Sequence, residues 1–147
     1  MDRLAYFEIA GKKYPLSFSL MAEKTMAARY GSLSKMGEVL DGDNEKTFSE
    51  LAFILELLIK QGCAYKNMFE SNIPPCENAP VEDGKWIPLT EEQIYVGVNA
   101  HNQKDMMIAI KKAMGVGQRQ EIETVEKNLE AQGEEDVLLI STSGEEF

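Results

Sequence analysis

The chain has 147 residues, 44% of them hydrophobic and 27% charged, which suits one domain with an appendage or two very small domains. Its 15 basic and 25 acidic side chains give a net charge of −10, which argues against nucleic acid as a partner because phosphate binding needs clustered Lys and Arg. No apolar run could span a bilayer, and the charged N-terminus lacks the apolar core of a signal peptide. We therefore expect a cytoplasmic protein with no nucleic-acid and no membrane partner.

The first elements that the sequence predicts are two strands joined by a turn. Residues 4–9 and 14–18 alternate in hydrophobicity, and Ala10-Gly11-Lys12-Lys13 between them is turn-like because Gly11 can take a positive φ. Pro15 implies an edge position or a strand start, since proline has no N–H to donate. A lone hairpin is marginal in water, so we expect it to pack on the helices that follow.

Three helices are predicted next. Residues 20–30 are rich in good helix formers and are followed by Gly31, a natural C-terminal cap. A second short helix keeps helical spacing over residues 33–40. The third helix follows a predicted capping box, Thr47-x-x-Glu50, and Gly62 predicts a break in it.

The third helix is apolar on almost every side between residues 48 and 59. A main stripe at helical spacing predicts the core face, and further apolar residues lie off that stripe. Such a helix is either central to a core or covered by a partner. Two interpretations stay open: the hairpin and the second helix cover it, or part of it is an oligomer or partner surface.

The second half of the chain differs in character. Residues 71–89 hold four of the five prolines, which predicts an irregular linker whose end is pinned to the body by Trp86 and Ile87. A second capping box, Thr90-x-x-Gln93, starts another helix. The chain therefore divides into a hairpin plus helical core, a Pro-rich linker, a helical C-terminal region and an acidic tail, over residues 1–70, 71–89, 90–132 and 133–147. The predicted fold class is α+β and mostly α-helical, with the N-terminal β-hairpin packed on a small helical bundle.

No pattern predicts a metal site. The acidic loop over residues 41–45 suggests an EF-hand, but Lys46 stands where the loop needs glycine and Ala52 where it needs a bidentate glutamate. His101 is the only histidine and has only polar neighbours, so we expect a surface or helix-end residue.

Catalytic and cofactor patterns are missing as well. No glycine-rich phosphate loop is present. Cys63 and Cys76 are too few for a disulfide framework or a zinc site, and Cys63 has no basic neighbour, which predicts a buried, unreactive thiol. We therefore predict a non-enzymatic protein without catalytic residues, cofactor or metal.

Three segments carry a resemblance to a known family. They are Phe7-Glu8-Ile9-Ala10-Gly11-Lys12-Lys13-Tyr14-Pro15-Leu16-Ser17-Phe18, then Ala28-Arg29-Tyr30-Gly31, and then the apolar helix over residues 51–59 with Tyr65. In this order they resemble the phage tail assembly chaperones of siphophages and prophages in Gram-positive hosts. In that family a hairpin with a Gly-Lys turn precedes a helix ending near Tyr-Gly, and an apolar helix follows. The match covers the first seventy residues.

The resemblance implies a role in tail morphogenesis. Such chaperones bind the long, helical tape-measure protein before tail-tube subunits polymerise around it, so the tape-measure protein is the expected partner and the tail-tube protein a further one. The chaperone works in the host cytoplasm and leaves before the tail is complete, and many members also have a longer, frameshifted form. A homo-oligomer stays open, because an apolar face that meets a different surface gives head-to-tail assembly.

The apolar residues off the main stripe are the candidate partner-binding surface: Phe53, Ile54, Leu57, Met68 and Phe69. Two alternatives stay open. A phage structural protein, such as a head–tail adaptor or a minor tail component, would remain in the finished particle. An acidic DNA mimic that inhibits a DNA-binding protein would place carboxylates in phosphate-like rows, and the predicted Glu-rich helix over residues 118–132 keeps this alternative open.

Overall fold

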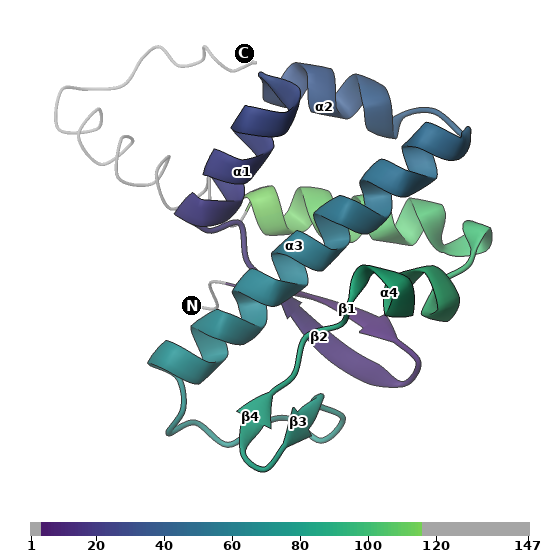
Figure 1. Cartoon of the computed structure of the whole chain (residues 1–147). Coiled ribbons are helices and arrows are strands. Elements are labelled where there is room, and N and C mark those ends of the chain that lie inside the picture. Colours follow the sequence, from purple (N-terminus) through teal and green to yellow (C-terminus); the bar gives the residue numbers. More distant parts are fainter. Residues whose placement is uncertain (1–3, 116–147) are drawn as a thin grey trace, which may run out of the picture. The chain divides into compact units, whose positions relative to one another are not determined.

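A computed structural model describes residues 4–115, which all lie within one compact unit, Met1–Gly117. The fold is α+β and mostly helical, as the sequence predicts (Figure 1). A further helix follows α4 and is described over residues 103–115. The predicted helix over 118–132 and the acidic tail over 133–147 lie outside the described residues. The labelled elements are β1 (Ala5–Ile9), β2 (Lys12–Leu16), α1 (Leu20–Tyr30), α2 (Leu33–Leu40), α3 (Glu45–Phe69), β3 (Val81–Glu82), β4 (Lys85–Trp86) and α4 (Glu91–Gly97).

The predicted N-terminal hairpin is present, with β1 antiparallel to β2. Ala10 and Gly11 have φ values of 52° and 82°, the paired positive angles of a two-residue type I′ turn. Pairs in such a ladder alternate between hydrogen-bonded and non-hydrogen-bonded, starting with the bonded pair beside the turn. Pro15 lies opposite Tyr6, a non-hydrogen-bonded position, so its missing N–H costs the hairpin nothing.

The outer edge of β2 is covered by two other parts of the chain. The backbone N–H of Lys13 donates to the carbonyl of Asn78 over 2.9 Å, and that of Ser17 donates to the carbonyl of Leu58 in α3 over 3.0 Å. The hairpin therefore packs on α3, as expected from the sequence, and its exposed edge is reduced.

Helix α3 runs unbroken for 25 residues, so the predicted break at Gly62 is wrong. Gly62 is buried where α3 meets β2, and a Cβ added there would come within 2.1 Å of the carbonyl oxygen of Pro15. Position 62 requires glycine because β2 approaches α3 too closely to leave room for a Cβ. It does not end the helix.

The start of α3 also differs from the prediction of a capping box at Thr47 and Glu50. The helix begins at Glu45, with Asn44 as its N-cap, and Asn44 Oδ1 accepts a 2.9 Å hydrogen bond from the backbone N–H of Thr47. Thr47 is buried, and its hydroxyl donates to the carbonyl of Val39 in α2 over 3.0 Å. Thr47 thus ties α3 to α2, and Glu50 ties α3 to α1 by accepting a hydrogen bond from Arg29.

Residues 71–89 contain a second, short hairpin, formed by β3 and β4. The side chain of Asn67, in α3, accepts from the backbone N–H of Trp86 over 2.9 Å and donates to its carbonyl over 3.1 Å. Trp86 is buried, so it pins this segment as predicted, whereas Ile87 is exposed and does not. Helix α4 then begins at the predicted capping box of Thr90 and Gln93.

One hydrophobic core joins residues 4–70 with the described part of 90–132. Helix α3 lies at its centre, with the first hairpin on one side and α1, α2, α4 and the last described helix around it (Figure 1). None of the helices described here is both long and apolar enough to cross a membrane. The largest fully buried apolar side chains are Leu16, Met26, Leu51, Ile54, Leu55, Leu58, Ile59 and Ile110.

Candidate protein-binding surfaces

The five candidate binding residues do not form one surface. Met68 and Phe69, at the end of α3, are 72% and 70% exposed. Phe53 and Leu57 are partly buried against the core, and Ile54 is fully buried. The assignment of Ile54 to a partner surface is therefore wrong for the folded chain.

Ile54 is covered because α1 lies along that side of α3. Glu50, Ile54 and Gln61 form one row on α3, since positions four and seven apart share a helix face. Both ends of this row bind α1: the hydroxyl of Ser19 donates to Gln61 Oε1 over 2.6 Å, and Arg29 binds Glu50. The two helices thus run antiparallel with Ile54 between their anchor points.

The Arg29 anchor is a bidentate ion pair. Arg29 Nε donates to Glu50 Oε1 over 2.8 Å and Nη2 donates to Oε2 over 3.1 Å, while the Tyr30 hydroxyl also donates to Oε1. The hydrogen bond from Arg29 holds the pKa of Glu50 below its ordinary value of 4.5, and burial together with the Glu50 contact raises the pKa of Tyr30. The Arg29 guanidinium also lies 3.9 Å from the centre of the Phe53 ring, so Phe53 is screened from solvent.

A small apolar patch remains at the C-terminal end of α3. We call Met68, Phe69 and Ile73 the α3 end patch, because all three are exposed there. The Phe69 ring packs against Tyr65, with 5.3 Å between the ring centres. Two of the five predicted residues thus lie on an apolar surface open to a partner.

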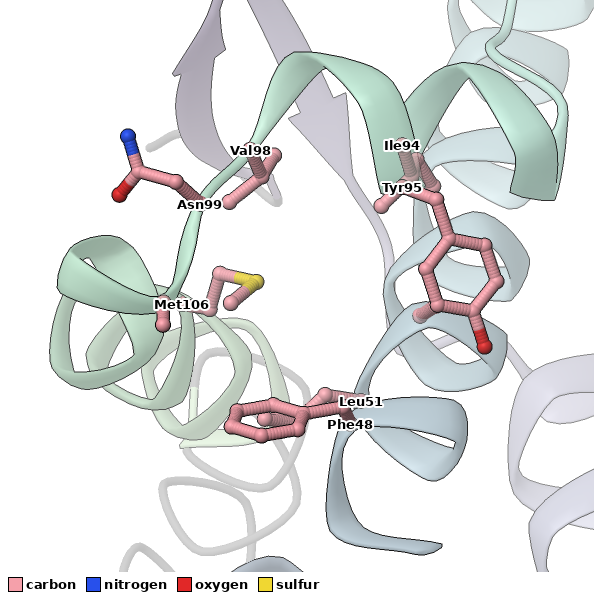
Figure 2. Close-up of a pocket in the computed structure, with 9 residues that line it drawn as sticks. Phe48, Leu51, Ile94, Tyr95, Val98, Asn99 and Met106 are labelled. Atoms are coloured by element: carbon pink, nitrogen blue, oxygen red, sulfur yellow. The ribbon is translucent and has the colours of Figure 1, made fainter. Parts of the chain in front are cut away.

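A second apolar site lies between α3, α4 and the helix that follows. It is an open pocket of about 240 Å³, which we call the α3–α4 pocket. Figure 2 shows Phe48 and Leu51 reaching it from α3, Ile94 and Tyr95 from α4, and Met106 from the next helix. Its lining residues are Phe48, Leu51, Ala52, Ile94, Tyr95, Val98, Asn99, Ala100 and Met106.

The lining of this pocket is almost entirely apolar. Its polar member, Asn99, uses its side-chain oxygen to accept from the backbone N–H of His101 over 2.9 Å, so that oxygen is engaged in the local turn. Tyr95, which lines the pocket, is 49% exposed, and the next residue in the chain, Val96, is 83% exposed. The pocket therefore offers van der Waals contact and apolar burial, with few polar groups to recognise a polar ligand.

Sequence reasoning missed this pocket, although one signal was available. Helix α4 has only seven residues, of which Ile94, Tyr95 and Val96 are consecutive and apolar. Three consecutive positions cover about 200–300° of a helix, so one core face cannot bury them all. An unpaired apolar side on α4 was therefore predictable, but the walls supplied by α3 were not.

The described part of the chain shows no site built from reactive side chains. Among residues 4–115, no cluster of His, Cys, Asp and Glu could hold a metal ion. Cys63 is buried, which raises the pKa of its thiol to about 12, and Cys76 and His101 are exposed. Comparison of the chain with protein-family models, with curated proteins and with solved structures finds no match.

Proposed function

We propose that this chain is a non-enzymatic tail assembly chaperone that binds the tape-measure protein in the host cytoplasm during tail morphogenesis. The proposal joins the resemblance of the first seventy residues to one structural observation, the open apolar pocket between α3 and α4. A tape measure's amphipathic helices expose apolar stripes that would otherwise aggregate. An apolar pocket on a chain of net charge −10 can cover such a stripe while the charge keeps the complex soluble.

The α3 end patch supports the same proposal. Met68 and Phe69 give a second apolar contact at the other end of α3 from the pocket. Methionine adapts its shape to varied partners because its side chain is unbranched and flexible. Two separate apolar contacts would let the chain follow an extended helical partner.

Co-expression with the tape-measure gene of the same genomic cluster, followed by pull-down and size-exclusion chromatography, tests this function. We expect a soluble complex with a tape measure that is insoluble when expressed alone. An unrelated acidic protein of similar size is the control for charge alone. If no complex forms and mass spectrometry finds the chain in purified particles, it is a structural protein and the proposal is wrong.

A further inference from the structure

We propose that the α3–α4 pocket binds apolar side chains of an amphipathic helix whose flanking residues are basic. This inference deepens the proposed function, and rests on it, by assigning the partner's chemistry and the site that takes it. It is carried by the distribution of charge around the pocket, which is mostly negative beside the lining residues.

Of the five charged residues that stand three or four positions from a lining residue, four are acidic. On α4, Glu91 and Glu92 precede Tyr95 by four and three positions, and on α3, Glu45 precedes Phe48 by three. Residues at these spacings are neighbours on a helix surface. The fourth acidic position is Glu56, one turn after the lining residue Ala52.

The fifth is basic: Lys104 stands four positions after Ala100, whose short 3-10 helix (Ala100–Asn102) runs into the last described helix. Helix α4 contains no Lys or Arg. In α3, Lys46 stands two positions before Phe48. A spacing of two turns a side chain by about 200° around a helix axis, to the far side. With four acidic residues and one basic residue, the rim of the pocket carries a net negative charge.

Three of the four rim carboxylates have an alternative explanation. Glu45, Glu91 and Glu92 lie in first turns of helices, where acidic side chains favour the helix dipole. Glu56 lies in the middle of α3, where the dipole gives no such advantage. The dipole therefore does not account for the whole rim, and the variants below separate the two explanations.

A second copy of this chain fits the pocket less well than a basic partner. Each copy carries a net charge of −10, so an acidic rim facing another acidic molecule is repulsive. A basic flank on the incoming helix would instead be attracted and oriented by the rim. The charge thus selects a foreign, basic helix over self-association.

The test uses the full-length chain and two designed helical peptides of about 18 residues, long enough to span several turns. Both carry leucines at helical spacing; one has lysines beside that stripe and the other has glutamates. Fluorescence anisotropy of the labelled peptides gives the dissociation constants. We expect the lysine peptide to bind about tenfold more tightly, with the preference shrinking as salt is raised.

Matched variants locate the binding site. Ala100 lines the pocket yet is exposed, so Ala100→Arg blocks its mouth without burying a charge, and Ala28→Arg makes the same change on the exposed face of α1. We expect a loss of about tenfold in affinity for Ala100→Arg and none for Ala28→Arg. Circular dichroism and thermal unfolding of both variants check that they fold equally well.

Charge variants test the rim. Glu56→Gln combined with Glu92→Gln should reduce the preference for the lysine peptide. The control pair, Glu23→Gln with Glu38→Gln on α1 and α2, should keep it. If the rim glutamates serve only the helix dipole, both pairs will leave the peptide preference unchanged and the inference is wrong.

Three further results would overturn the inference. The first is equal binding of the two peptides, and the second is unchanged binding by Ala100→Arg. The third is an oligomer, seen by sedimentation, that Ala100→Arg dissociates, since a second copy would then fill the pocket. If wild type and Ala100→Arg both solubilise the tape-measure protein, the proposed function stands but this pocket is not the site. If the peptides behave as expected but the tape-measure protein stays insoluble, the pocket binds basic helices and the proposed function is wrong.

Discussion

The carbonyl oxygen of Pro15 lies directly over Gly62, so that a Cβ at position 62 would approach it to 2.1 Å. This contact seats the N-terminal hairpin on the middle of α3. Because this carbonyl is part of the β2 backbone, it cannot move aside as the end of a flexible side chain could.

Gly62→Ala should therefore destabilise the protein although alanine favours helices. Overpacking against backbone costs about 1–3 kcal/mol, and the helix propensity of alanine returns at most about 1 kcal/mol. Gly37→Ala is the matched control, since Gly37 lies inside α2 and an added Cβ meets no atom within 4 Å. Urea unfolding should show a lower free energy of unfolding for Gly62→Ala and a higher one for Gly37→Ala. An equal increase in both variants would mean that the close approach is absent.

The ion pair between Arg29 and Glu50 makes the stability of the folded protein depend on pH in the acidic range. The pKa of Glu50 is lowered in the folded protein, chiefly by the hydrogen bond from Arg29, so the unfolded state binds the proton more readily. This contribution to stability is complete above the ordinary value of 4.5 and is lost as pH falls through the lower folded pKa. Urea midpoints measured from pH 7 to about pH 3 should fall less steeply for Glu50→Gln than for wild type. Glu38→Gln, on the exposed surface of α2, should follow the wild-type curve.

The two cysteines should react at very different rates. Cys76 is exposed, whereas burial raises the pKa of the Cys63 thiol to about 12 and keeps reagents away. A disulfide reagent at pH 8 should modify one thiol rapidly in the native protein and the second only in denaturant. In Cys76→Ser the fast phase should vanish. Rapid modification of that variant would show that Cys63 is accessible.

Trp86 is the only tryptophan, so its fluorescence reports how the second hairpin is held. Asn67→Ala removes both hydrogen bonds to the Trp86 backbone and should cost about 1–3 kcal/mol, because two backbone groups lose their partners. We expect red-shifted emission and stronger acrylamide quenching with little change in helix content. Asn72→Ala, in the exposed loop before the hairpin, should leave the emission unchanged; a shift of equal size in both variants would contradict the role of Asn67.

Elements governed by local signals were predictable from the sequence. Helices α1 and α2 have the predicted bounds, and Gly31 has the positive φ, 84°, that its position after Tyr30 predicts. The capping box of Thr90 and Gln93 is likewise decided by four neighbouring residues. Such signals need no knowledge of tertiary packing.

The errors arose where a distant contact overrides a local signal. Gly62 reads as a helix breaker until the approach of Pro15 is known. Thr47 and Glu50 read as a capping box, yet each binds another helix. Ile54 lies off the main stripe of α3, and only the placement of α1 explains its burial.

The candidate site was predictable only in part. The exposure of Met68 and Phe69 follows from their position at the end of an apolar helix. The α3–α4 pocket depends on how α3 and α4 face each other, which hydrophobic periodicity does not determine. The acidic rim became visible only once the lining residues were known.

The most direct test of the central claim is light scattering during dilution of the denatured tape-measure protein into buffer, with and without this chain. Equimolar chain should suppress the scattering, and Ala100→Arg should suppress it less than Ala28→Arg. Scattering that is unchanged by the wild-type chain, under conditions where the chain itself stays folded and soluble, would contradict the claim that it is a chaperone.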